Sequence, residues 1–194
     1  HYFHEVWKGT RSHSIVERSL RYLFQATKEM TGLTDHGADR TNRLVRSWLG
    51  QGHKNPFYVF IHYIEPHNPL QAPYPFRHKY VKMSKSIDNR KLRRMADNPL
   101  VFFTDEIILN ENEIATLTGL YDGEIAYMDQ KIGELITFLK KENLYDDAMI
   151  ILTADHGEHF GEHGLYSHVS SLYEPIVHIP LIVKFPRSTI RPGV

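Results

Sequence analysis

Apolar residues recur at alternating spacings of three and four along residues 114–139, which is the period of one helical face. Asn110 and Glu113 stand at capping-box positions just before this stripe, and Lys140 and Lys141 follow where cations complement the helix dipole. The pattern predicts one long amphipathic helix. Its apolar face comprises Ile114, Leu117, Tyr121, Ile125, Met128, Ile132, Leu135 and Leu139.

Two sets of residues within this helix need separate interpretation. Three glycines lower the helix propensity, and we expect them to allow close packing on a sheet: Gly119, Gly123 and Gly133. Three carboxylates stand at helical spacing, and we assign them to the solvent face rather than to a site: Asp122, Glu124 and Asp129.

Shorter apolar runs indicate strands. Residues 57–61 and 149–152 show no polar alternation, which predicts strands covered on both faces, and residues 179–183 form a further apolar run. Two more helices are predicted. One covers residues 14–27 and begins at a capping box, and the other begins at Asp39 and ends at Gly50, with Leu44, Val45, Trp48 and Leu49 on one face.

Composition narrows the functional classes. The chain has 194 residues and equal numbers of basic and acidic side chains, 23 each, so no net field favours nucleic acid or an anionic membrane as a partner. No apolar run approaches the roughly 20 residues of a membrane helix, and no targeting segment is visible. With no cysteine, disulfides and thiolate metal sites are excluded, whereas 13 histidines raise the question of a metal. The compartment and oligomeric state stay open.

The segment after residues 149–152 carries the candidate chemistry. Asp155, His156 and Gly157 step off the predicted strand into a glycine-rich turn, and ligands in open α/β sheets gather at the carboxyl ends of strands. A carboxylate oxygen and an imidazole nitrogen together suit a divalent cation. Taken alone, an Asp-His-Gly could equally be a capping Asp beside a solvated His.

Three motifs in order resemble those of sulfatases, in the alkaline phosphatase-like superfamily. Residues 152–164, followed by His168, resemble the metal-site motif, residues 57–69 the central strand and its loop, and residues 120–133 the connecting helix. The resemblance implies an α/β fold with a mostly parallel sheet flanked by helices. It also implies that residues 1–194 are part of a sulfatase catalytic domain, with residues 73–110 an insertion or substrate-rim segment.

The resemblance also implies roles for particular residues. Asp155 and His156 would bind a divalent metal, with calcium expected and magnesium or manganese as alternatives. His67 and His168 would be the catalytic and substrate-binding residues, one of them donating a proton. His156 stands where classical arylsulfatases often have Asn, so the ester acted on, sulfate or phosphate, stays open. Glu158 is a candidate partner that orients His156.

The family nucleophile is a formylglycine made in a C/S-x-P-x-R motif, which this sequence does not contain. We therefore expect a partial domain, inactive in isolation, of a hydrolase that acts on sulfate esters of small molecules or glycans. The alternatives are a phosphodiesterase or phosphonate monoester hydrolase, with a phosphoester as partner, and a non-catalytic relative. Nucleic acid and a membrane span are not expected.

Two patterns are given structural or surface roles. His159-Phe-Gly-Glu-His163 fits the H-x-x-E-H pattern of one zinc protease group, but that chemistry needs a helix. Gly157, Gly161 and Gly164 interrupt the segment, so His159 and His163 are assigned structural roles. A basic run could attract an anionic substrate, although a solvated insertion is the preferred interpretation: Arg77, His78, Lys79, Lys82, Lys85, Arg90, Lys91, Arg93 and Arg94.

Overall fold

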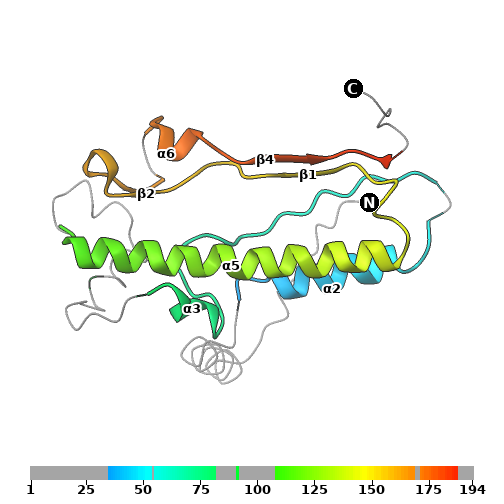
Figure 1. Ribbon diagram of the computed structural model, residues 1–194, viewed down its shortest axis with the longest axis horizontal. Helices are drawn as coiled ribbons and strands as arrows, with labels where there is room; N and C mark the ends of the chain where they lie inside the picture. The colour runs from blue at the N-terminus through cyan, green and yellow to red at the C-terminus, as the bar shows by residue number, and fades with distance from the viewer. Residues whose placement is uncertain (1–34, 54, 82–90, 92–107, 169–170, 188–194) are drawn as a thin grey trace, which may run out of the picture.

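The computed structural model describes residues 35–53, 55–81, 91, 108–168 and 171–187. The long helix α5 (Glu111–Lys141) runs through the middle, with two helices on one side and the strands on the other (Figure 1). The remaining elements are α2 (Ala38–Leu49), α3 (Phe76–Lys79), β1 (Ile150–Thr153), β2 (His159–Phe160), the 3-10 helix η2 (Glu162–Gly164), β3 (Tyr166–Ser167), α6 (Glu174–Val177) and β4 (Leu181–Lys184).

Helix α5 forms as its sequence predicts. The Asn110 side chain accepts from the Glu113 amide at 3.0 Å, and the Glu113 side chain accepts from the Asn110 amide at 2.8 Å, which completes the capping box. Among the described residues, no helix is long and apolar enough to cross a membrane. The assignment of carboxylates to the solvent face holds for Asp122 and Asp129 but is wrong for Glu124, whose side chain is fully buried.

The strands differ from the expected mostly parallel sheet. The β1–β4 pair is antiparallel, with Ile150 opposite Lys184, and the β2–β3 pair is antiparallel as well. Residues 57–61 have no regular secondary structure, and Tyr58 and Phe60 are 84% and 75% exposed. The prediction that this segment is a strand covered on both faces is wrong for the described structure, because the described residues provide neither a ladder partner nor a second covering layer.

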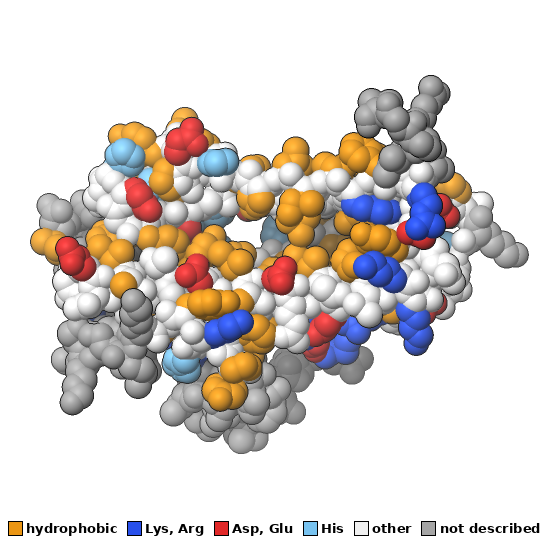
Figure 2. Space-filling model, in the orientation of Figure 1, with side chains coloured by type: hydrophobic (Ala, Val, Ile, Leu, Met, Phe, Trp, Pro, Cys, Tyr) orange, Lys and Arg blue, Asp and Glu red, His pale blue; other side chains and the backbone are white. Residues whose placement is uncertain are grey.

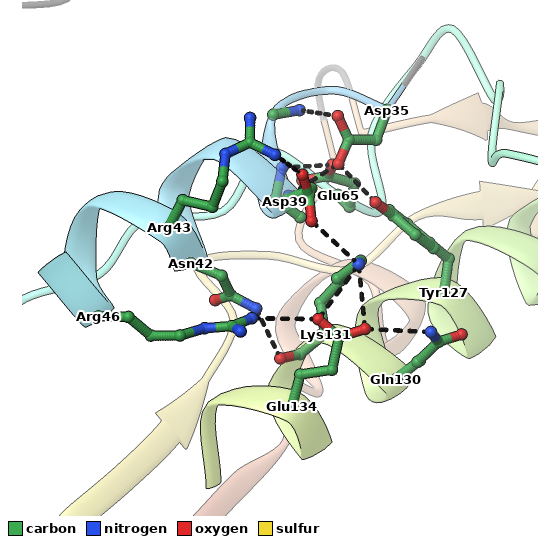
Figure 3. A network of polar contacts seen from close by, with 12 residues as sticks. Asp35, Asp39, Asn42, Arg43, Arg46, Glu65, Tyr127, Gln130, Lys131 and Glu134 are labelled. Atoms are coloured by element: carbon green, nitrogen blue, oxygen red, sulfur yellow. Dashed lines mark hydrogen bonds and ion pairs between the residues drawn. The ribbon is translucent and has the colours of Figure 1, made fainter. Parts of the chain in front are cut away.

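A polar network aligns α2 with α5 (Figure 3). The Lys131 ammonium contacts Asp39 at 3.3 Å and Glu134 at 3.0 Å, and the buried Asn42 amide donates to the Lys131 carbonyl at 2.8 Å. The Asp35 carboxylate accepts from the Asp39 amide at 2.8 Å, so Asp35 rather than Asp39 satisfies the start of α2. Gly50 ends the helix as predicted.

Two glycines of α5 permit a close approach, although to α3 rather than to a sheet. A Cβ atom on Gly123 would lie 2.6 Å from the Phe76 carbonyl oxygen, and one on Gly119 would lie 2.7 Å from that of Tyr80. Gly133 has nothing within 4 Å. Most of the basic run, most of residues 73–110 and the helix predicted over residues 14–27 lie outside the described residues. Within the described part, Lys91 forms an ion pair with Glu113 at 2.8 Å.

Candidate functional site

The loop that follows residues 57–61 carries His67, and hydrogen bonds hold it against the helices. The Tyr63 hydroxyl donates to the Asn42 side chain at 2.6 Å, and the Ala38 amide donates to the Glu65 carboxylate at 3.0 Å. The two acceptors, Asn42 and Glu65, lie in the network between α2 and α5 (Figure 3). The Glu65–Pro66 and Asn68–Pro69 peptide bonds are cis. His67 is therefore presented from a loop whose position is set by the helix pair.

Glu65 in this loop and Glu124 on α5 are both buried carboxylates. Glu124 on α5 accepts from the Gln71 amide at 2.5 Å, and the second oxygens of Glu65 and Glu124 are buried with no hydrogen-bond partner in the described structure. Burial raises the pKa of Glu124 to about 7; the Gln71 hydrogen bond opposes this shift, and the nearby Glu65 charge adds to it. Neither Glu65 nor Glu124 was predicted to lie near the site.

A second loop leaves the carboxyl end of β1 and carries the Asp155-His156 pair. The Asp155 carboxylate accepts from the His156 amide at 3.0 Å, and its Oδ1 lies 3.8 Å from His156 Nε2. Gly157 has a steric reason to be glycine, since a Cβ atom there would lie 2.0 Å from the Pro175 carbonyl oxygen. The Gly157 amide donates to the Ile176 carbonyl at 2.8 Å, which ties this loop to α6.

The structure brings the predicted histidines together from these two loops. The His168 ring stacks on His156 at 4.3 Å between centroids, and the His67 ring lies 5.2 Å from His168. Asp155 is exposed beside this cluster. His67 and His168, which lie far apart in the sequence, therefore meet in one place.

Glu158 contacts His168 and not His156, the partner that the sequence predicted. Its Oε2 lies 3.1 Å from His168 Nδ1, whereas His156 turns its own Nδ1 toward the Gly157 carbonyl at 2.8 Å. His156 has thus satisfied one ring nitrogen within its own loop and leaves no bond there for Glu158. The carboxylate contacts His168 instead.

The metal-binding capacity of the site is partial. The 3.8 Å between Asp155 Oδ1 and His156 Nε2 is short enough for one ion, at about 2.2–2.4 Å from each atom, to contact both. One carboxylate oxygen and one imidazole nitrogen fit a divalent cation in their chemistry. Within the described ranges, however, no group of three or more His, Asp or Glu side chains is arranged to hold a metal ion.

The remaining loop histidines are structural. His159 is buried in β2, and its Nε2 lies 2.7 Å from the Ser171 hydroxyl, while the His163 ring stacks on Tyr173 at 3.9 Å. This segment forms a short strand and a 3-10 turn rather than an α-helix. The helical face that the zinc protease pattern requires is therefore not formed by residues 159–163.

Comparison with known proteins identifies the family. The family model named Sulfatase matches residues 2–190. The multifunctional alkaline phosphatase superfamily protein PehA of Trinickia caryophylli is 29% identical over 162 residues, 74% of this chain and 31% of PehA. Arylsulfatase K of Mus musculus is 38% identical over 76 residues, 39% of this chain and 14% of that protein.

Solved structures agree with this assignment. The phosphonate monoester hydrolase SpPMH from Silicibacter pomeroyi superimposes with a TM-score of 0.58 at 27% identity, covering 82% of this chain and 34% of that one. The chain thus spans about a third of the length of PehA and of SpPMH. The motifs, the clustered histidines and the family model agree: the chain belongs to the sulfatase family.

Proposed function

We propose that the full-length protein is a metal-dependent hydrolase of sulfate esters, and that this chain supplies half of its metal site and the histidines that meet the ester anion. The observation that carries the proposal is the convergence of His67, His156 and His168 beside Asp155. Membership of the sulfatase family supports the same reaction class.

In this proposal, Asp155 and His156 hold a divalent cation, for which calcium is the first candidate and magnesium or manganese are alternatives. A bound cation would neutralise charge on the ester oxygens. The other metal ligands and the formylglycine nucleophile expected from the family resemblance would come from parts of the full-length protein outside the described residues.

His67 and His168 would contact the non-bridging oxygens of the ester. An imidazole can donate a hydrogen bond to an anionic oxygen and can protonate a leaving oxygen near neutral pH. The two rings come from different loops and lie 5.2 Å apart, a spacing at which both can reach one small tetrahedral group. We assign one of them as the proton donor to the leaving group.

A second candidate is a hydrolase of phosphonate monoesters or phosphodiesters. The family resemblance favours it, since it implies that phosphonate monoester hydrolases commonly have His at the position of His156, and the superposition on SpPMH favours it further. The two reactions would use the same described residues, so only the choice of ester separates them.

Replacement of Asp155 in the metal-loaded, full-length protein tests the proposal. We expect Asp155→Ala to lower kcat/KM for p-nitrophenyl sulfate by at least about 100-fold and to reduce the bound divalent metal measured by elemental analysis. A p-nitrophenyl phosphonate monoester assayed in parallel identifies the preferred ester. Asp129→Ala, an exposed carboxylate on α5, is the matched control and should change neither quantity.

Full metal content and full activity in Asp155→Ala would rule out the metal assignment. A wild-type protein that binds metal but turns over neither ester would support the non-catalytic alternative.

A further inference from the structure

Glu158 directly precedes β2 and His168 directly follows β3, so the two residues lie at the same end of this antiparallel pair. His159 pairs with Ser167 and Phe160 with Tyr166, and Glu158 and His168 are the residues that directly flank these strands at this end. Their side chains meet there, with Oε2 3.1 Å from Nδ1. The strand pair therefore brings these two residues close together.

The Glu158 carboxylate is buried, and one of its two oxygens lacks a hydrogen-bond partner among the described residues. The Glu158 side chain is 7% exposed, and its Oε1 is buried without a hydrogen-bond partner in the described structure. Burying an ionised carboxylate with one oxygen unpaired costs free energy. Among the described residues, the contact with His168 is the one hydrogen bond that this carboxylate makes.

Two contacts hold the His168 ring in place. The face of its ring lies against His156, and its Nδ1 edge is bound by Glu158, so the plane and the rotation of the ring are both fixed. No described residue hydrogen-bonds to the other ring nitrogen, Nε2. The ring is thus oriented with one nitrogen occupied by the protein and the other available to a ligand.

We propose that Glu158 is a positioning residue that fixes the His168 imidazole so that its Nε2 faces the ester anion. This inference rests on the proposed function, since it gives His168 its substrate-binding role. Glu158 itself touches neither the ester nor the metal, and acts only through His168. Glu174 and His178 form a Glu–His pair of a different kind, since they lie 3.8 Å apart with both side chains exposed.

A double-mutant cycle in the metal-loaded, full-length protein tests this role. We expect Glu158→Gln to lower kcat for p-nitrophenyl sulfate by about 10- to 100-fold while KM and metal content change by less than about threefold. In the His168→Ala background, Glu158→Gln should lower kcat no further, because its effect passes through that ring. Glu174→Gln is the matched control and should leave kcat unchanged. Glu158→Asp, which keeps the charge, should recover part of the activity.

Two outcomes in the kinetics would overturn the inference: an unchanged kcat in Glu158→Gln, or an equal loss of kcat in the presence and absence of His168. A direct readout separates this inference from the proposed function. In 15N-histidine-labelled full-length protein, Glu158→Gln should shift the imidazole 15N resonances of His168, and Glu174→Gln should not. If those resonances stay in place, the positioning role is wrong. If Glu158→Gln shifts these resonances but the wild-type protein cleaves neither ester, the proposed function is refuted and the Glu158–His168 contact is retained.

Discussion

At the scale of single residues, Glu124 links the loop of His67 to pH. Its side chain is fully buried, and burial raises its pKa from 4.5 to about 7, with Gln71 opposing and Glu65 reinforcing the shift. Its other titratable neighbours are His36, whose Nε2 is 3.9 Å from a Glu124 carboxylate oxygen, and Arg77, whose charge lowers the pKa of Glu124. Because the folded pKa lies above the unfolded one, the stabilising contribution is fully present below about pH 4.5 and is lost as pH rises through about 7.

Glu124→Gln should remove this pH dependence. We expect wild type to lose about 3 kcal/mol of unfolding free energy relative to the variant between pH 4.5 and pH 8. Urea denaturation of both proteins at several pH values measures the difference. Asp122→Asn, which changes an exposed carboxylate two residues earlier, should follow the wild-type curve. Parallel curves for wild type and Glu124→Gln would contradict the prediction.

Some residues in and near the site could be predicted from sequence motifs, and others could not. Asp155, His156, His67 and His168 stand in ordered motifs, so the sequence alone could nominate them, and the structure brings their loops together. The burial of Glu124 carried a weaker signal that the prediction missed. Glu124 follows the buried Leu117 by seven residues, which is two helical turns, and therefore lies on the same face.

At the scale of elements, the glycines of α5 provide a matched pair within one helix. Gly123 faces the backbone of α3, where an added methyl group would meet the Phe76 carbonyl at 2.6 Å, while Gly133 is exposed with nothing within 4 Å. We expect Gly123→Ala to destabilise the protein by about 1–3 kcal/mol through overpacking. Gly133→Ala should stabilise it by roughly 0.5–1 kcal/mol through helix propensity. Urea denaturation at a fixed pH measures both changes, and two shifts of the same sign would contradict the assigned packing.

Among the elements, those that depend on nearby residues were predicted from the sequence, and those that depend on distant partners were not. Helix α5 and its capping box depend on residues close together in the chain, and both were predicted. The strand predicted over residues 57–61 is not formed in the described structure, because a strand needs a partner that its own sequence does not specify. The apolar runs that became β1 and β4 were recognised, but their antiparallel pairing depends on chain direction in space, which apolar content does not encode.

At the scale of the whole molecule, apolar surface faces solvent between the layers. Exposed hydrophobic side chains line residues 57–60 and both strands of the β1–β4 pair, including Ile151, Leu181 and Ile182. Figure 2 shows an opening between the β1–β4 layer and α5 that hydrophobic side chains border. Contiguous exposed apolar surface of this kind marks an interface or an aggregation hazard. PehA and SpPMH are about three times as long as the matched region, so we expect further elements of a complete family domain to cover this surface.

A protein made of only these 194 residues should therefore bind the dye ANS more strongly than the full-length protein does at equal molar concentration, because ANS reports accessible apolar surface. Fluorescence titration at neutral pH measures the difference. Replacing the outermost aromatics, in Tyr58→Lys together with Phe60→Lys, should lower the signal of the short protein. Replacing Arg43→Lys on the exposed side of α2 should not. Equal dye binding by the short and full-length proteins would mean that the apolar surface stays open in the complete domain, and a partner outside the chain would then have to be sought for it.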